Sequence, residues 1–237
     1  MKTSPFAVPS NGQTCADCAI REYSVCSSLD GAEMRDLEQL IRRVHFSTCQ
    51  TVFGQEDMSL PLFSLVDGVI RLYKDLPDGR RQIVAFALPG DLLGMTTADR
   101  HGVSADTIGP VTVCRIARLP FSRFSADKLN LLRRINELVV RELNRARDHM
   151  VLLGRRSAEE KVATFLVDWR DRLAELREIA DIVPLPMSRQ DIADYLGLTI
   201  ETVSRTFTKL ERDGVIAIIA GGICLRNPAR VKALAAA

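Results

Sequence analysis

The sequence lacks a strong excess of charge of either sign, because 32 Lys and Arg residues stand against 30 Asp and Glu residues. No overall basic field therefore points to nucleic acid, although a local basic face can hide within a neutral total. No apolar run reaches the roughly 18 residues that a membrane-spanning helix needs. The N-terminal stretch MKTSPFAVPSNGQTC has one Lys and no apolar run, and predicts no signal or transit peptide. We expect a cytoplasmic protein without a membrane segment.

The sequence also lacks a recognisable catalytic constellation. Its histidines, His45, His101 and His149, are scattered, and no Ser/His/Asp set or carboxylate pair stands out around them. No Gly-rich phosphate-binding loop is present either. A residue set of this kind gives no nucleophile, base or phosphate cradle from which to argue a reaction. We expect that the protein is not an enzyme.

Six cysteines are present, and their distribution is uneven. Three of them, Cys15, Cys18 and Cys26, lie close together with two and then seven residues between them. Clustered thiols in an intracellular protein more often bind a metal or perform redox chemistry than form structural disulfides. Both a closed zinc site and a [4Fe–4S] cluster normally take four ligands. The candidates for the fourth are the isolated cysteines Cys49, Cys114 and Cys224.

The patterns predict an α+β protein in four consecutive parts. Residues 1–30 form a cysteine-rich, cluster-binding segment, and residues 31–126 form a sensor domain. Short alternating runs broken by turns at Gly68, Pro77-Asp78-Gly79 and Gly90 predict an antiparallel, jelly-roll-like β-roll there. Residues 127–154 form a long dimerisation helix, after which Gly154 interrupts the apolar pattern, and residues 155–237 form a winged helix-turn-helix domain. The stretch Val183-Pro-Leu-Pro186 is expected to be an extended connector.

The long helix carries two apolar stripes. The first repeats at alternating spacings of four and three, as in a coiled-coil seam, and comprises Leu132, Asn136, Val139, Leu143, Ala146, Met150 and Leu153. The second, Leu131, Ile135 and Leu138, runs beside it. Two stripes predict two partners, the domain's own sheet and a second copy of the chain. The alternative is one wide stripe against a single core, but a lone polar Asn136 favours the dimer because it fixes register.

Residues 188–213 carry a specific local pattern. Ser188 and Thr199 are positioned to cap two successive helices, and Gly197 supplies the left-handed turn between them. The spacing of Ala193, Gly197 and Val203 is typical of a helix-turn-helix, with a plain helical hairpin as the alternative. The runs VIAIIA and GICLR after it predict a hairpin wing.

The second of these helices exposes a patch suited to reading DNA. Glu201, Ser204 and Arg205 share one face of its first turns, the part of a recognition helix that enters the major groove. Arg can donate to guanine O6 and N7, and Glu can accept from cytosine N4. Residues that could hold phosphates flank this patch, namely Thr202, Thr206 and Lys209. The alternative is a solvated face with a helix-supporting Glu–Arg pair.

These features together resemble the Crp/Fnr superfamily over nearly the whole chain. The stretch Thr199-Ile-Glu-Thr-Val-Ser-Arg205 is similar to its recognition signature, and Leu88-Pro-Gly-Asp-Leu-Leu-Gly94 to its β-roll turn. The cysteine spacing is similar to that of the FnrN/FixK-type proteins in the Fnr branch. The resemblance implies that Glu201, Ser204 and Arg205 read TTGA-N6-TCAA-like double-stranded sites. No Arg-Ser pair follows the β-roll turn, so we do not expect cyclic AMP as the ligand.

The resemblance selects Cys114 as the fourth ligand, beside Cys15, Cys18 and Cys26, and a [4Fe–4S] cluster as the cofactor. It implies an oxygen-responsive homodimer that contacts RNA polymerase, mainly as an activator, in anaerobic, microaerobic or nitrogen-fixation control. Cys49 and Cys224 are expected to be ordinary buried thiols. The alternatives are zinc at the cysteines, a redox-active disulfide, or a cluster-free regulator that senses a small molecule or thiol oxidation.

Overall fold

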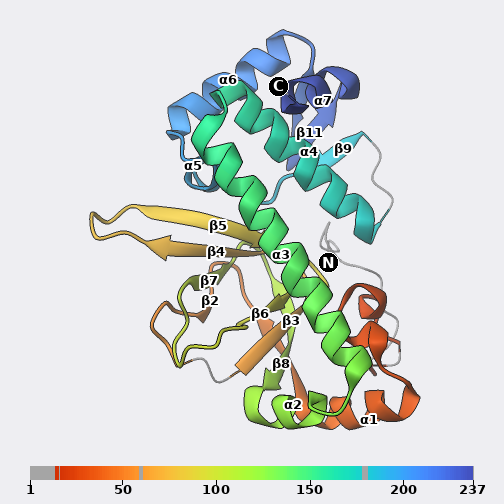
Figure 1. The fold of residues 1–237 in the computed structure, drawn as a ribbon. Coiled ribbons are helices and arrows are strands. Elements are labelled where there is room, and N and C mark those ends of the chain that lie inside the picture. Colours follow the sequence, from red (N-terminus) through yellow and green to blue (C-terminus); the bar gives the residue numbers. More distant parts are fainter. Residues whose placement is uncertain (1–13, 16, 59–60, 178–180, 237) are drawn as a thin grey trace. The chain divides into compact units, whose positions relative to one another are not determined.

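The computed structural model describes residues 14–15, 17–58, 61–177 and 181–236 (Figure 1). Residues 1–13 and residue 16 of the expected cysteine-rich segment, 1–30, lie outside this part. Internal contacts divide the chain into two units, residues 1–77 with 85–144 and residues 78–84 with 145–237. The division falls inside one long helix, whose first half belongs to the first unit and whose second half belongs to the second. The expected boundary near Gly154 stays a prediction.

The first unit begins with short helical turns and continues as an antiparallel β-roll. Its helical elements are η1 (Arg21–Tyr23), η2 (Val25–Ser28), α1 (Gly31–Leu40), α2 (Arg118–Ser125) and the first half of α3 (Leu129–Arg155). Its strands are β1 (Ile41–Phe46), β2 (Thr51–Phe53), β3 (Pro61–Asp67), β4 (Ile70–Asp75), β5 (Arg81–Ala87, which spans the division), β6 (Leu92–Leu93), β7 (Ser104–Thr107) and β8 (Val111–Ala117).

Two four-stranded sheets form the roll, with strand orders β1-β8-β3-β6 and β2-β7-β4-β5. A core of buried side chains contributed by both sheets includes Phe53, Phe63, Leu65, Ile70 and Val113. The alternating apolar pattern is explained by this arrangement, because successive side chains of a strand point to opposite faces. The α+β class and the antiparallel β-roll predicted from the sequence are confirmed.

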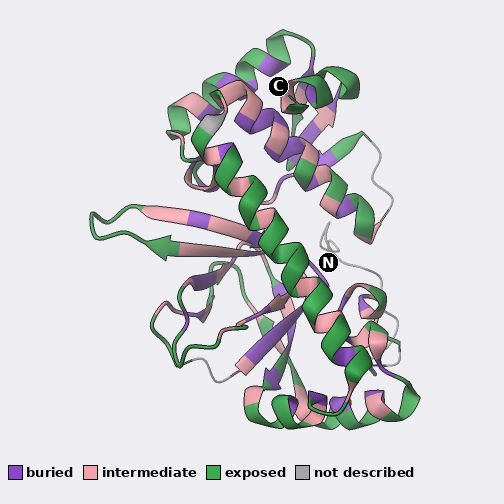
Figure 2. Ribbon diagram, in the orientation of Figure 1, coloured by how far each residue is buried: buried purple, intermediate pink, exposed green. Residues whose placement is uncertain are grey.

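Helix α3 is one continuous helix from Leu129 to Arg155 (Figure 1). Its bounds, Leu129–Arg155, agree within two residues with the range 127–154 expected from the sequence, and it ends one residue after Gly154. Most of its visible surface is exposed (Figure 2).

The two stripes of α3 have different surroundings. Leu131 is buried in a cluster with Val25, Leu29 and Leu37, and Ile135 and Leu138 pack against the same cluster. The seam side chains are exposed instead: Leu132 by 40%, Val139 by 43%, Leu143 by 46% and Met150 by 63%. Within the described residues, one stripe is covered by the first unit and the other is not. This favours two partners over a single wide core-facing stripe.

The second unit contains a winged helix-turn-helix. Its elements after α3 are α4 (Ala158–Leu176), β9 (Ile182–Pro184), α5 (Arg189–Leu196), α6 (Ile200–Arg212), β10 (Ile216–Ile219), β11 (Gly222–Leu225) and α7 (Pro228–Ala236). Capping boxes at Ser157 and Ser188 start α4 and α5. The wing is the β10–β11 hairpin, as predicted.

Two features of the second unit differ from the sequence prediction. The expected connector around Val183 is a third strand, β9, because its backbone pairs antiparallel with the free edge of β11. Helix α7 was not predicted; Pro228 stands at its first position, where a missing N–H costs nothing.

Gly68 and Gly79 make a matched test of the roll's turns, because both have a positive φ, +91° and +82°. A Cβ on Gly68 would lie 2.5 Å from the Pro110 carbonyl oxygen, whereas a Cβ on Gly79 would meet nothing within 4 Å. Gly79→Ala should lower the free energy of unfolding by about 1–2 kcal/mol. Gly68→Ala should lower it by about 2–5 kcal/mol, because the clash adds to the backbone strain.

The measurement is urea unfolding followed by circular dichroism. The fluorescence of Trp169, the only tryptophan, follows the second unit separately. Equal losses in the two variants would show that the contact with Pro110 is not what requires glycine at position 68.

Candidate functional site

The cysteine segment is an ordered chain of short turns between Thr14 and Leu29. The backbone N–H of Cys18 donates to the Cys15 carbonyl (3.4 Å), and the N–H of Arg21 donates to the Cys18 carbonyl (3.0 Å). The hydroxyl of Ser24 then accepts from the backbone N–H of Cys26 (3.2 Å) and so begins η2. The segment is therefore fixed by its own hydrogen bonds at each cysteine.

Contacts with α1, the roll and α3 hold this segment in place. The backbone N–H of Cys15 donates to Glu38 Oε1 of α1 at 3.1 Å. Cys15 is buried in the cluster that contains Leu131 of α3 and Ile116 of β8, and Cys26 packs against it. Two of the three clustered thiols therefore lie in an apolar nest between α1, β8 and the first turns of α3.

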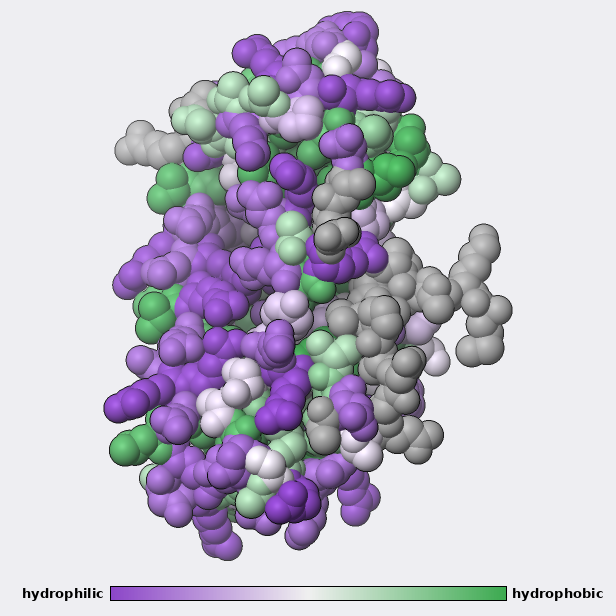
Figure 3. Space-filling model, turned by 90° about the vertical axis from the view of Figure 1, so that its right-hand side faces the viewer, coloured by the Kyte–Doolittle hydropathy of each residue, from purple (hydrophilic) through white to green (hydrophobic). Residues whose placement is uncertain are grey.

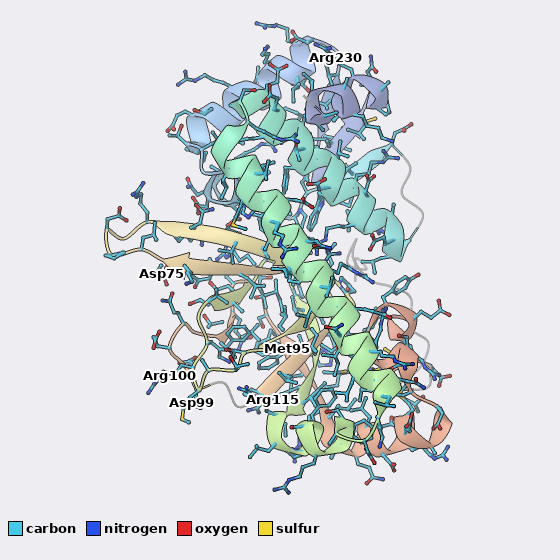
Figure 4. All side chains as sticks on the ribbon, viewed as in Figure 1. Asp75, Met95, Asp99, Arg100, Arg115 and Arg230 are labelled. Atoms are coloured by element: carbon cyan, nitrogen blue, oxygen red, sulfur yellow. The ribbon has the colours of Figure 1, made fainter. Side chains whose placement is uncertain are left out.

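Cys114 belongs to the same side of β8 as this nest. Side chains alternate along a strand, so Cys114 shares a face with Ile116, which is part of the nest. The intervening Arg115, labelled in Figure 4, points to the other face and lines a cavity inside the roll with Phe53 and Phe63. The strand thus directs the Cys114 thiol toward the cysteine segment.

Burial and neighbouring charges raise the pKa values of three of the four candidate thiols. Burial, the Glu38 carboxylate and the other three thiols raise the pKa of Cys15 to about 12. Burial also raises the pKa of Cys26 to about 11, with Cys114 and Cys18 adding to the rise and Ser24 opposing it. Burial raises the pKa of Cys114 as well, while Arg43 on the neighbouring strand lowers it.

The donor set suits an iron–sulfur cluster or zinc, because both bind cysteine sulfur. All six cysteines are free. In the described part of the chain, no three His, Cys, Asp or Glu side chains are already arranged to hold a metal ion. Such arrangements often form only on binding, when thiols are deprotonated. Cys15, Cys18, Cys26 and Cys114 therefore fit the group by the chemistry of their donors.

Neither remaining cysteine is part of this buried cluster. Cys49 is exposed, with φ +57° in the turn between β1 and β2, so the expectation of a buried thiol is wrong for it. Cys224 is half-buried on β11 in the second unit.

The helix-turn-helix geometry rests on caps at both ends of its turn. Gly197 ends α5 with φ +61° and ψ +41°, the left-handed conformation that glycine favours. The Thr199 hydroxyl accepts from the backbone N–H of Thr202 (3.2 Å) and begins α6. Val203, Phe207 and Leu210 are buried on one side of α6.

The opposite side of α6 exposes Glu201, Ser204 and Arg205 together. The N–H of Glu201 itself, the Thr199 hydroxyl and Arg205 hold the pKa of the exposed Glu201 carboxyl below its usual value. Glu201 therefore presents a carboxylate, and Arg205 a guanidinium, on one solvent-facing patch in the helix's first turns.

Not all of the predicted phosphate-binding residues beside this patch are exposed and free to reach DNA. Thr202 is half-buried, and Thr206 is buried, with its hydroxyl donating to the Thr202 carbonyl (2.8 Å). Lys209 is exposed but pairs with Glu159 of α4. The structure thus does not place Thr206 where a DNA phosphate would lie, and Lys209 would have to leave Glu159 to reach one.

Some residues around these sites had no signal in the sequence. Glu38 and Arg43 reach Cys15 and Cys114 across long sequence separations, and Arg189 stacks its guanidinium over the Phe207 ring, 3.4 Å from the centroid. Isolated charged residues follow no spacing that would identify them.

Figure 3 shows mainly hydrophilic side chains on the visible face, with apolar ones in separate groups. Among the described residues, none of the helices has the length and apolar character that crossing a membrane requires.

Two family profiles match the chain. Residues 43–128 match the cyclic nucleotide-binding domain, and residues 185–216 match the bacterial regulatory proteins of the crp family. The first match covers the β-roll strands and α2, and the second covers the helix-turn-helix.

Curated relatives match the chain over most of its length. The nitrogen fixation regulation protein FixK of Bradyrhizobium diazoefficiens is 66% identical over 100% of both chains. The transcriptional activatory protein AadR of Rhodopseudomonas palustris is 53% identical over 93% of this chain and 92% of its own. The solved structure of FixK2 from Bradyrhizobium japonicum has 37% identity and a TM-score of 0.77, covering 83% of this chain and 98% of that one. The chain belongs to the Crp/Fnr family of bacterial transcription regulators, and its relatives place it in the Fnr branch.

Proposed function

We propose that this regulator is an oxygen-responsive, FixK-type transcription activator that binds DNA as a homodimer while a [4Fe–4S] cluster is intact. The observation that carries the proposal is the packing of Cys15 and Cys26 with Ile116 of β8 and Leu131 of α3, on the face of β8 that also bears Cys114. The names of the relatives, which refer to nitrogen fixation regulation and activation, support a role in that control. Contact with RNA polymerase is part of the proposal.

Cys15, Cys18, Cys26 and Cys114 would hold the cluster as thiolates. When bound, it supplies an oxygen-sensitive link among these four residues. The chain's own residues do the rest: the apolar nest excludes water, and Glu38 and Ser24 fix the backbone at Cys15 and Cys26. Loss of the link would release the segment from the base of α3 and shift the population away from the paired dimer.

The exposed seam of α3 would pair with a second copy. Two recognition helices α6 would then face successive major grooves of a TTGA-N6-TCAA-like site. Glu201, Ser204 and Arg205 form the exposed patch that would read bases there.

A cyclic nucleotide is not proposed as the effector, despite the family profile. The stretch after the β-roll turn has no Arg-Ser pair that would bind its phosphate. The turn itself is in contact with the cysteine segment, because a Cβ on Gly90 would be only 2.9 Å from the Tyr23 Cβ.

The cofactor prediction concerns iron content. Protein purified without oxygen should contain about four iron and four sulfide per chain, and air should bleach it. Cys15→Ser, Cys18→Ser, Cys26→Ser and Cys114→Ser should each abolish the cluster, because each removes one of four ligands. Cys49→Ser and Cys224→Ser are the controls and should retain it. Zinc in place of iron, or full iron in Cys114→Ser, would contradict the proposed site.

The dimer prediction concerns the seam. Leu143→Glu would place two like charges in a buried strip, and an unpaired buried charge costs about 3–5 kcal/mol. Sedimentation should show monomers even when the cluster is present. Val151→Glu, also on α3 and also exposed, lies one position outside the seam and should leave the dimer intact. If Leu143→Glu still forms a stable dimer, the partner surface lies elsewhere.

The DNA prediction separates base reading from charge attraction. Arg205→Ala should cost about 1–3 kcal/mol per half-site and relax the preference for guanine at one position. Arg212→Ala removes the same charge two turns further along α6, at an exposed side chain. Arg212→Ala should weaken binding to all DNA sequences alike and reduce the salt dependence of that binding. Binding to duplexes varied one base pair at a time decides between them; a uniform effect of Arg205→Ala would mean that α6 does not read sequence.

A further inference from the structure

Arg134 of α3 connects the dimerisation helix to the cysteine segment. Its Nε donates to the Ser24 carbonyl (3.1 Å), and its Nη2 donates to the carbonyls of Glu22 (3.3 Å) and Tyr23 (3.1 Å). Its Nη1 pairs with Glu137, one turn on in α3, at 3.1 Å. The Arg134 side chain is only 16% exposed. A single guanidinium thus binds three consecutive carbonyls of the sensor segment.

These carbonyls lie midway between two of the candidate ligands. They stand where η1 ends and η2 begins, in the stretch that joins Cys18 to Cys26. Ser24 is fully buried, and its carbonyl also accepts from the backbone N–H (3.4 Å) and the hydroxyl (3.1 Å) of Ser27. Arg134 adds a charged donor to these carbonyls from a neighbouring helix.

The same stretch is closed in on its other side by the β-roll turn. Gly90 has φ +97°, and a Cβ there would come within 3.2 Å of the Tyr23 carbonyl oxygen. The stretch from Glu22 to Ser24 is therefore held between this turn and α3, beside the lower half of that helix in Figure 1. Any shift of Cys18 or Cys26 that moves the stretch must also move its carbonyls relative to Arg134.

Arg134 lies on the covered side of α3. Leu131 and Leu138, three residues before and four after it, pack on the cluster that contains Cys15. The seam residues Leu132 and Asn136 are two residues away on either side, which places them on the opposite side of the same turns of the helix. A change in how Arg134 is held therefore acts on the turns of helix that present the seam.

We propose that Arg134 is the positioning residue through which the state of the cysteine segment reaches the dimerisation face of α3. This rests on the proposed function, since it assumes that the segment changes when the cluster is lost. With the segment ordered, three carbonyls fix the guanidinium and the first turns of α3. With the segment released, Arg134 loses all three acceptors, and the exposed Glu137 carboxylate is left as its partner.

The test compares DNA affinity of cluster-loaded and cluster-free protein. In the wild type, the cluster-loaded protein should bind DNA on the order of tenfold or more tightly than the cluster-free protein, which is the usual size of an allosteric coupling. Arg134→Ala should still load iron and sulfide, because all four thiols remain, but its ratio should fall toward one. Arg134→Lys keeps the charge without the planar fork and should give an intermediate ratio. Arg133→Ala removes the same charge from the adjacent exposed position and should keep the wild-type ratio.

The outcomes separate the two proposals. A wild type without iron, or without any response to its loss, overturns the proposed function itself. A wild-type ratio in Arg134→Ala, or an equal loss in Arg133→Ala, overturns the role of Arg134. If Arg134→Ala and Arg134→Lys both fail to load the cluster, Arg134 only holds the segment together and the coupling role is overturned. Hydrogen exchange provides a second readout: Arg134→Ala should speed exchange in both residues 22–28 and the first turns of α3.

Discussion

Helix α3 carries apolar stripes on two neighbouring faces, and the described chain covers only one of them. Leu131, Ile135 and Leu138 are covered by the nest that contains Cys15, whereas Val139 and Leu143 are left to solvent. Because both faces belong to one helix, a change in the packing of the cysteine segment would also act on the proposed pairing surface. Cys15 and Cys26 lie against the covered stripe, near the face that we propose pairs with a second copy.

A buried charge connects the C-terminal end of the same helix to the helix-turn-helix. Lys161 of α4 is buried, and its Nζ donates to the carbonyls of Leu153 (3.1 Å) and Leu196 (3.2 Å). These carbonyls lie at the C-terminal ends of α3 and α5, where the helix dipole favours a cation. A buried ammonium needs such partners, because leaving it unpaired costs several kcal/mol. The end of α3 and the first helix of the helix-turn-helix are therefore fixed to each other within the second unit.

Local patterns made much of this fold predictable, and long-range contacts account for what was missed. The caps at Ser157, Ser188 and Thr199 act within one turn, so the sequence alone identifies them. Strand β9 exists because an edge of β11 is free to pair with it, which no local pattern records. The approach of Cys114 to the cysteine segment depends on strand pairing across the roll, so only the family resemblance suggested it. Thr206 was expected on the exposed face of α6, but it lies at the edge of that face and is buried.

The free energy of the Arg134 hydrogen bonds decides whether one residue is enough to couple the two faces of α3. Allosteric couplings are typically about 1–3 kcal/mol. A hydrogen bond to a charged group contributes about 1.5–3 kcal/mol net of its exchange with water. Arg134 donates to three carbonyls, so exchanging them for water when the segment is released changes the free energy by an amount of the size that a coupling needs. The ion pair with Glu137 is mostly exposed and contributes only about 0–1 kcal/mol, so it cannot replace them. The carbonyls of the cysteine segment, rather than the charge partner on the helix itself, are therefore the contacts of Arg134 that can carry the proposed coupling.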